Sequence, residues 1–144
     1  MTQKDLDEDA SQLVRGTSAQ ASQQPYFRNV AVLGAGSWGT ALAMAFARAG
    51  ASVQLWGRNA THVRRMTVSR KNERYLGERI LPSRIKPTCD LRPAAGQADA
   101  IFVATPSGAV RSLLQSISPA IRPGTPIISC TKGLVPETNQ LMCA

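Results

Sequence analysis

Three glycines, Gly34, Gly36 and Gly39, stand at the G-x-G-x-x-G spacing. Gly34 permits a tight turn, Gly36 lets a pyrophosphate approach the backbone, and Gly39 lets a helix pack closely against a strand. The chemistry is anion binding by N–H groups at a helix N-terminus, where the macrodipole favours negative charge. The spacing therefore predicts a dinucleotide-binding turn.

The elements on either side of the glycines must hold this turn in place. Residues 30–33 form a short apolar run rich in β-branched residues, which is typical of a buried parallel strand. A helical stripe follows, and Gly50 stands where a helix ends. The predicted inward face of this helix consists of Leu42, Ala45, Phe46 and Ala49.

The end of the next strand, residues 52–56, bears on cofactor selectivity. An NAD-specific site has Asp or Glu there, roughly 20 residues past the glycines, to bind the ribose 2′-hydroxyl. Here Arg58 and Asn59 follow the strand instead. An arginine there can bind a 2′-phosphate, so we favour this role over a merely solvated side chain. Asn59 is predicted to cap a helix whose inward residues are Val63, Met66 and Thr67.

Strands and helices alternate along the remaining chain. Residues 85–88, 100–104 and 126–129 are predicted strands, and helical stretches begin near Asp90, after Pro106 and at Pro136. This alternation predicts an α/β fold, a Rossmann-like doubly wound parallel sheet. Ligands of such sheets lie at the carboxyl ends of the strands. The groups expected at those ends are residues 34–39, Arg58, Pro106 and Lys132.

The composition fits one soluble domain: 144 residues, 43% of them hydrophobic and 18% charged. Residues 1–27 are predicted to be a disordered polar tail, and residues 28–144 the folded domain. The tail has neither the apolar core of a signal peptide nor the composition of a transit peptide, and no apolar run is long enough to span a membrane. We therefore expect a cytoplasmic protein that binds no membrane.

Two ligand classes, metals and nucleic acids, are disfavoured by residue usage. The cysteines Cys89, Cys130 and Cys143 form no C-x-x-C pair, and His62 is the only histidine, so we expect reduced thiols, a surface histidine near a helix start and no metal site. The net charge is +8, and residues 58–92 are strongly basic. Tyr75 is the only aromatic ring in that run, so we favour a solvated rim around a phosphate site over nucleic-acid binding.

Five blocks in order resemble the bacterial-type NAD(P)-dependent glycerol-3-phosphate dehydrogenases. They cover roughly residues 29–141, and Ser37-Trp38 is more specific than the glycines alone. One departure is Gly77, where the family more often has proline. The blocks read GAGSWGTALA from Gly34, LWGR from Leu55, NERYLGERILPSRIKPTCDL from Asn72, ATPSGAVRSLL from Ala104 and TKGL from Thr131.

The resemblance implies reversible hydride transfer between NAD(P)H and dihydroxyacetone phosphate, which yields sn-glycerol 3-phosphate. By position, Ser37, Trp38 and Arg58 would contact the cofactor, with NADPH favoured over NADH. Lys132 would contact both cofactor and substrate, and Tyr75 would line the site. The full-length family protein is a possible homodimer.

Family members continue into a helical second domain that supplies the general-acid lysine and the substrate-phosphate arginine. The sequence thus predicts the cofactor-binding half of the enzyme, truncated at its C-terminal end, with no catalytic general acid among its own residues. Two alternatives stay open at this stage. One is a non-catalytic dinucleotide-binding module, and the other is a fragment of another hydroxyacid or 6-phosphogluconate-type dehydrogenase.

Overall fold

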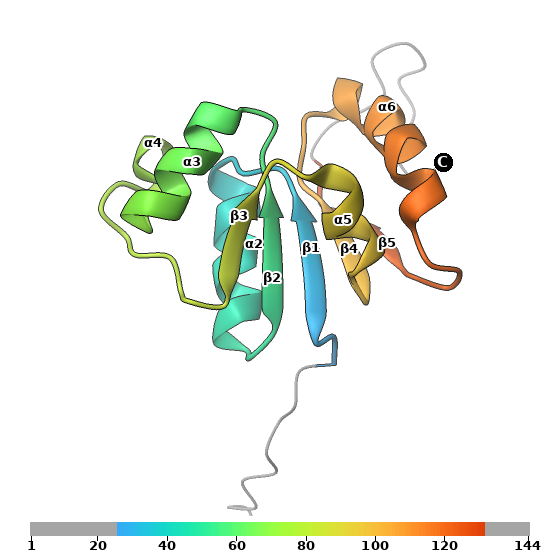
Figure 1. Cartoon of the computed structure of the whole chain (residues 1–144), viewed down its shortest axis with the longest axis horizontal. Helices are drawn as coiled ribbons and strands as arrows, with labels where there is room; N and C mark the ends of the chain where they lie inside the picture. The colour runs from blue at the N-terminus through green and yellow to red at the C-terminus, as the bar shows by residue number, and fades with distance from the viewer. Residues whose placement is uncertain (1–25, 132–144) are drawn as a thin grey trace, which may run out of the picture.

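The computed structural model describes residues 26–131 and centres on one parallel sheet with the strand order β3-β2-β1-β4-β5 (Figure 1). The sheet and the short helices around it form the predicted doubly wound α/β fold. The strands are β1 (Asn29–Leu33), β2 (Ser52–Trp56), β3 (Ile85–Thr88), β4 (Ala100–Val103) and β5 (Ile127–Ser129). The helices are α2 (Ser37–Arg48), α3 (Ala60–Ser69), α4 (Glu73–Leu76), α5 (Leu91–Gly96), α6 (Ser107–Ile117) and the 3₁₀ turn η1 (Ser118–Ala120).

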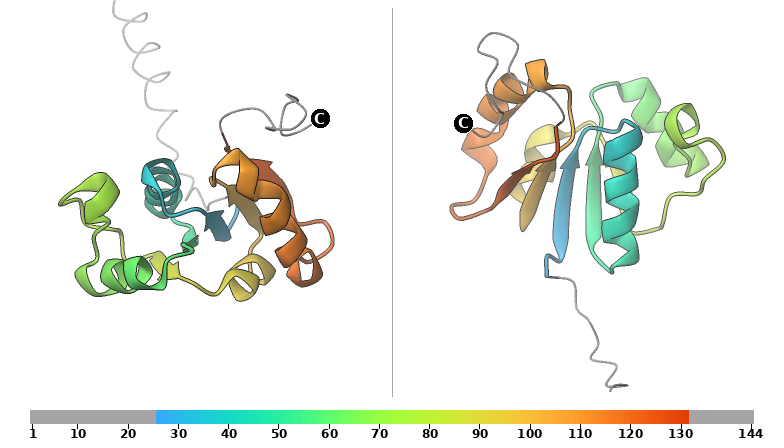
Figure 2. Two further views of the ribbon diagram at one scale, coloured as in Figure 1. Left: turned by 90° about the horizontal axis from the view of Figure 1, so that it is seen from above. Right: turned by 180° about the vertical axis from the view of Figure 1, so that it is seen from behind.

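The two faces of the sheet carry separate cores because side chains alternate along each strand. Val30 and Val32 of β1 pack with α2 and α3, whereas Ala31 and Leu33 pack with α5 and α6. Figure 2 shows α2 and α5 on opposite sides of the sheet. The middle strand is therefore buried on both faces, as its unbroken apolar sequence predicts.

The predicted inward face of α2 is wrong. Ala45 and Ala49 are exposed, and Leu42 and Phe46 are only half-buried. The face that contains Gly39, which lies against the Gly34 carbonyl, is the one that packs on the sheet, so the helix is rotated from the predicted orientation. Phe46 instead packs at the margin against Phe102, with the ring centroids 4.4 Å apart. The buried residues of α2 are Gly39, Thr40, Ala43, Met44 and Ala47.

Helix α3 begins at the predicted cap. The Asn59 side-chain oxygen accepts a hydrogen bond of 2.9 Å from the His62 backbone N–H. Val63 and Met66 are buried, as predicted. Thr67 is exposed, contrary to prediction, and its hydroxyl donates to the Val63 carbonyl one turn back. A polar side chain in an exposed helix position can satisfy itself on its own backbone, so it gives no inward preference.

Residues 70–85 connect α3 to β3 through a loop that the sequence did not predict. Arg70 adopts the left-handed conformation, with φ of 56°, and ends α3. Its guanidinium donates to the carbonyl oxygens of Leu81, Pro82 and Ile85. This clamp closes the loop and fixes where the residues immediately after Arg70 lie.

Asp99 links the segments at the amino-terminal ends of the strands. Its carboxylate accepts hydrogen bonds from the backbone N–H groups of Asn29 at 2.8 Å and Arg28 at 3.2 Å. Arg122 forms an ion pair with the same carboxylate at 3.1 Å. These contacts hold the start of β1 beside the start of β4.

Within residues 26–131, no helix is both long and apolar enough to cross a membrane. Phe27, from the predicted tail, packs against the core on the β1 side. The rest of that tail, Lys132, Cys143 and the predicted last helix lie outside the described residues.

Candidate functional site

The loops that follow the three central strands, β2, β1 and β4, lie side by side at the carboxyl ends of the strands. Leu33, the last residue of β1, pairs with Trp56 of β2 and with Val103 of β4. The Gly34 N–H then donates to the Trp56 carbonyl at 3.0 Å, and the Ala104 N–H donates to the Leu33 carbonyl at 2.8 Å. The strands therefore end level with one another, and the glycine turn lies between the other two loops (Figure 1).

Gly34 and Gly39 are required by the fold itself. Gly34 has φ of 127°, and a β-carbon there would lie 2.5 Å from the Ala104 carbonyl oxygen. A β-carbon on Gly39 would overlap the Gly34 carbonyl oxygen and press on the Ala104 side chain. Only glycine at both positions allows α2 to start this close to β1 and β4.

Gly36 is different, because the fold places nothing beside it. A β-carbon there would have no protein atom within 4 Å, and its φ of −78° and ψ of −172° suit any residue. The fold alone gives no reason for glycine here. A ligand that approaches this backbone atom closely does give one, and the residues present thus fit a dinucleotide pyrophosphate.

The start of α2 leaves hydrogen-bond donors free. Gly36 is the N-cap residue, it supplies no side-chain cap, and the first turn has no acidic residue. Within the described part of the chain, the N–H groups of Gly36 and Ser37 have no acceptor. A helix N-terminus of this kind favours an anion. The side chains of Ser37 and Trp38 are exposed beside it, and Trp38 is 49% exposed.

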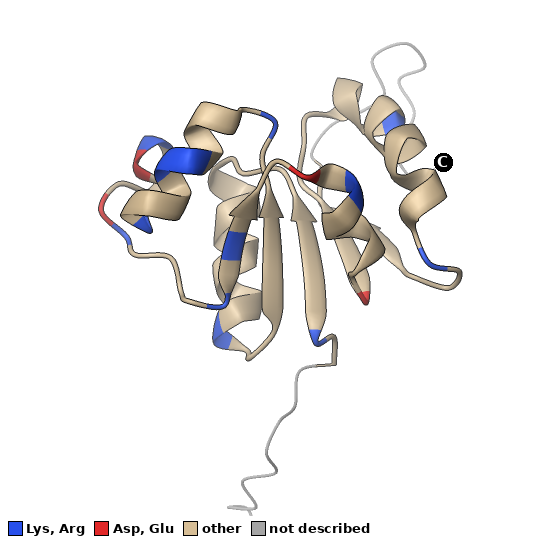
Figure 3. Cartoon of the chain, viewed as in Figure 1, with Lys and Arg blue, Asp and Glu red and all other residues tan. Residues whose placement is uncertain are grey.

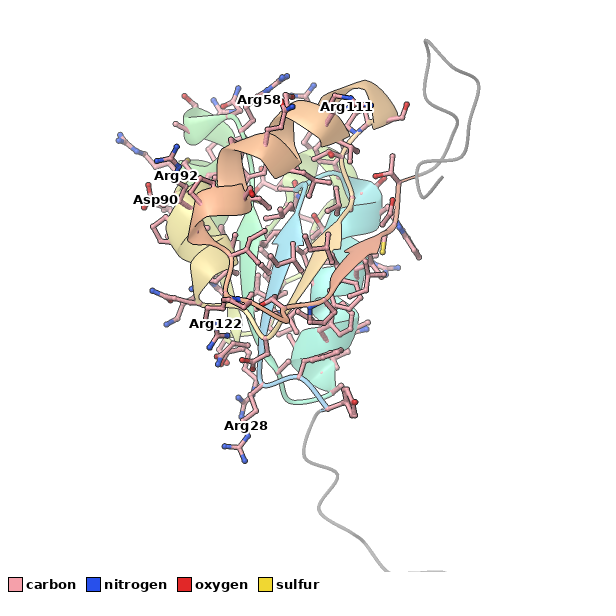
Figure 4. All side chains as sticks on the ribbon, turned by 90° about the vertical axis from the view of Figure 1, so that its right-hand side faces the viewer. Arg28, Arg58, Asp90, Arg92, Arg111 and Arg122 are labelled. Carbon is pink, nitrogen blue, oxygen red and sulfur yellow. The ribbon has the colours of Figure 1, made fainter. Side chains whose placement is uncertain are left out.

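Arg58 also lies at the carboxyl ends of the strands, one residue past the buried Gly57. The Gly57 N–H donates to the Thr88 carbonyl at 3.0 Å, which fixes the chain just before the arginine. The Arg58 side chain is exposed and forms no ion pair within residues 26–131. Figure 4 shows Arg58 and Arg111 at one end of the molecule, with Arg28 and Arg122 at the other. Arg58 therefore places a positive charge just after β2, and β2 itself contains no Asp or Glu.

Tyr75, of α4, packs against His62, of α3. Their rings meet edge to face with centroids 5.8 Å apart, and Tyr75 is 44% exposed. His62 lies near the start of α3, as predicted, although its side chain is half-buried rather than on the open surface. Its Nε2 atom is buried and has no hydrogen-bond partner among the described residues.

Two site residues were missed from the sequence, Asn72 and Thr40. Both are fully buried and they are hydrogen-bonded to each other and to the glycine turn. Asn72 precedes α4, which in a sequence suggests a helix cap, yet its side chain does not cap that helix. The only signal in the sequence was its place in the block beginning at Asn72, which carries no indication of a partner more than thirty residues away.

The remaining candidate groups are dispersed. Figure 3 shows Lys and Arg residues on several helices, strands and loops of the chain. Cys89 and Cys130 are free thiols, and burial raises the pKa of the Cys130 thiol. In the part of the chain that the structure describes, no three His, Cys, Asp or Glu residues are grouped to hold a metal ion.

Gly77, one of the departures from the pattern that the sequence resembles, ends α4 with φ of 59°. Proline cannot adopt a positive φ, so this loop is specific to a residue such as glycine. In this loop the Asn72 side chain bonds to the Ala35 carbonyl and the Tyr75 ring contacts His62.

Comparison with known proteins gives the family. Residues 29–144 match the family described as "NAD-dependent glycerol-3-phosphate dehydrogenase N-terminus". A curated relative from Bradyrhizobium diazoefficiens, glycerol-3-phosphate dehydrogenase (NAD(P)+), is 45% identical over 116 residues, which are 81% of this chain and 35% of the relative. The protein of the same name from Pseudoalteromonas translucida is 43% identical over 113 residues, 78% of this chain and 34% of its own.

Solved structures agree with the sequence matches. The crystal structure of glycerol-3-phosphate dehydrogenase from Coxiella burnetii superposes with a TM-score of 0.76 at 37% identity, covering 83% of this chain and 36% of that one. The Plasmodium falciparum glycerol-3-phosphate dehydrogenase gives 0.69 at 27% identity, with 78% and 34% covered. The chain thus spans about a third of the length of its curated relatives. It belongs to the NAD-dependent glycerol-3-phosphate dehydrogenase family, of which it contains the N-terminal region.

Proposed function

We propose that this chain is the cofactor-binding part of a glycerol-3-phosphate dehydrogenase that interconverts dihydroxyacetone phosphate and sn-glycerol 3-phosphate. Family membership supports the reaction class. The observation that carries the cofactor assignment is the open space at Gly36, next to backbone N–H groups that have no acceptor within residues 26–131. Unpaired backbone N–H groups beside a residue without a side chain can donate hydrogen bonds to a phosphate that approaches the backbone closely.

In this proposal the turn residues bind the cofactor through its pyrophosphate. The N–H groups of Gly36 and Ser37 donate to phosphate oxygens, and the start of α2 adds a favourable electrostatic field. Ser37 and Trp38 contact the cofactor with their exposed side chains. Bound NAD(P)H supplies the hydride for reduction of the ketone.

Arg58 is proposed to select for the 2′-phosphate. Its exposed guanidinium has no ion-pair partner among the described residues, and Asn59, the next residue, uses its side-chain oxygen to cap α3. No carboxylate therefore stands where an NAD-specific site would have one. We propose that NADPH binds at least as tightly as NADH.

Lys132 is proposed to lie beside both cofactor and substrate. Thr131, the residue before it, follows β5 and donates its hydroxyl to the Val103 carbonyl at the end of β4. That anchor supports a position for Lys132 at the carboxyl ends of the strands. Its ammonium would orient the substrate and stabilise negative charge on the ketone oxygen. We propose that the general acid and the arginine that binds the substrate phosphate come from the helical domain of the family. A cytoplasmic location and a homodimer of the full-length protein also stay predictions.

A fluorescence titration tests the cofactor assignment. Trp38 is about half exposed at the start of α2, so a bound nicotinamide dinucleotide should quench its emission. We expect saturable quenching of the 144-residue chain by NADPH, and much less quenching in Trp38→Phe, whose NADPH affinity is measured separately by calorimetry. A folded chain that takes up no NADPH or NADH by calorimetry would contradict the proposal.

A further inference from the structure

Asn72 joins the loop after α3 to the glycine turn through a buried network. Asn72 and Thr40 are the only fully buried polar side chains in the described core. The Asn72 Nδ2 group donates to the Ala35 carbonyl at 3.1 Å and to the Thr40 hydroxyl at 2.8 Å. The Thr40 hydroxyl in turn donates to the Gly36 carbonyl at 2.7 Å, and the Thr40 N–H donates to the same oxygen at 3.0 Å.

The chemistry of these groups fixes which way the Asn72 amide faces. The Thr40 hydroxyl has one hydrogen, which goes to the Gly36 carbonyl, so it can only accept from Asn72. The Ala35 carbonyl likewise can only accept. Both therefore require the NH₂ end of the amide, and the Asn72 Oδ1 atom is left buried with no partner in the described part of the protein. An oxygen in place of Nδ2 would face two acceptors.

Holding these two carbonyls also sets the direction of two N–H groups. All described peptide bonds are trans, so each carbonyl points opposite to the N–H of the next residue. The Ala35 carbonyl is bound toward Asn72, which turns the Gly36 N–H the other way. The Gly36 carbonyl is bound toward Thr40, which turns the Ser37 N–H the other way. Both of these N–H groups lack an acceptor within residues 26–131.

We propose that Asn72 is a positioning residue that aims the Gly36 and Ser37 N–H groups at the cofactor pyrophosphate, directly through Ala35 and indirectly through Thr40. The proposal rests on the dinucleotide site proposed above. Donors fixed before the ligand arrives lose little orientational freedom on binding, so the network raises affinity without touching the ligand. It also explains why a buried amide with an unsatisfied oxygen, which is costly to fold, is present beside this turn.

Binding of two ligands that differ in the pyrophosphate tests this role. We expect Asn72→Asp in the 144-residue chain to weaken NADPH binding about 10- to 100-fold, the equivalent of one hydrogen bond to a charged group. Adenosine 2′-phosphate has no pyrophosphate, so its affinity should be unchanged. In ¹H–¹⁵N spectra the Gly36 and Ser37 amide resonances should move strongly when NADPH is added to the parent chain, and weakly in the variant.

Thr40 variants keep the test valid if Asn72→Asp does not fold. Thr40→Val removes the hydroxyl at nearly constant volume and should weaken NADPH, while Thr40→Ser restores the hydroxyl and should recover most of the affinity. Thr67→Val is the matched control, because Thr67 makes the same hydroxyl-to-carbonyl bond on the exposed side of α3. It should bind NADPH as the parent chain does.

Two results would overturn the role of Asn72. One is parental NADPH affinity in folded Asn72→Asp or in Thr40→Val. The other is an equal loss for NADPH and adenosine 2′-phosphate, which would indicate general loosening of the fold. Failure of the parent chain itself to bind NADPH would instead contradict the dinucleotide site, so the two failures are distinguishable.

Discussion

Gly39 in the first turn of α2 lies so close to the Gly34 carbonyl oxygen that a β-carbon on Gly39 would overlap it. Gly36, between them, has open space at the corresponding position. Two glycines of one motif are thus constrained by the fold, whereas the fold does not constrain the third.

Gly36→Val should fold and lose the cofactor, whereas Gly39→Val should fail to fold stably. A β-carbon at position 36 has no protein atom within 4 Å apart from its chain neighbours, but a valine there occupies the space proposed for the pyrophosphate. The valine at position 39 must push α2 away from β1 and β4, and overpacking of this kind costs about 1–3 kcal/mol or more. Thermal unfolding followed by circular dichroism, and NADPH titration of the folded variants, separate the two effects. A Gly36→Val protein with parental NADPH affinity would place the pyrophosphate elsewhere.

Arg58→Ala should weaken NADPH more than NADH. Loss of a charge-assisted hydrogen bond to the 2′-phosphate costs about 1.5–3 kcal/mol at low ionic strength, and less in high salt because the side chain is exposed. Calorimetry with both cofactors at two salt concentrations measures the difference. Arg84→Ala is the control. Arg84 is also exposed, but it precedes β3 and therefore lies at the amino-terminal ends of the strands, whereas Arg58 lies at the carboxyl ends. Equal losses for both cofactors would remove the 2′-phosphate from Arg58.

Asp99 should make stability fall in acid. The hydrogen bond from the Asn29 N–H lowers the pKa of the Asp99 carboxyl, and the Arg122 side chain and the Arg28 N–H act in the same direction. A folded-state pKa below the unfolded value stabilises the protein at pH values above the unfolded pKa, and this contribution is lost as the pH falls through the folded one. Asp99→Asn should therefore be less stable than the parent chain at pH 7.

The difference between Asp99→Asn and the parent should shrink well below about pH 4, where both side chains are neutral. Urea unfolding at several pH values measures it. Asp90→Asn is a matched control, because the Asp90 side chain makes no capping hydrogen bond at the start of α5. A stability gap that is the same at every pH would show that the Asp99 charge does not contribute.

The 144-residue chain alone should bind NADPH yet reduce dihydroxyacetone phosphate no faster than buffer. Reduction of the ketone needs a proton donor, and general acid–base catalysis is typically worth about 10²–10⁴-fold. The resemblance assigns that donor to the helical domain of the family. Fusing the remainder of a relative's chain after Ala144 should restore turnover, and Lys132→Ala in the fusion should remove most of it. The assay is NADPH oxidation followed by absorbance. Rapid oxidation by the chain alone that depends on dihydroxyacetone phosphate would contradict the assignment of the proton donor to the helical domain.

The sequence by itself determined the features that depend on neighbours along the chain. The five strands within residues 26–131 lie within one residue of their predicted ranges, and the apolar runs of β1, β4 and β5 are bounded by glycine, proline or polar residues that mark their ends. The glycine spacing predicted the turn after β1, and Asn59 predicted the start of α3. Each of these rests on a contact within a few residues, so no knowledge of the tertiary fold is needed.

Tertiary structure alone decided which face of α2 is buried and what holds the turn. The predicted stripe contained Leu42 and Phe46, but the face that packs on the sheet is the one that contains Gly39, which lies against the Gly34 carbonyl. Asn72 and Thr40 are separated by 32 residues, and each looks like an ordinary polar residue in its own segment. Their hydrogen bond forms where the loop that the Arg70 guanidinium closes lies against the glycine turn. A spacing pattern cannot encode a partner that only the folded loop brings within reach.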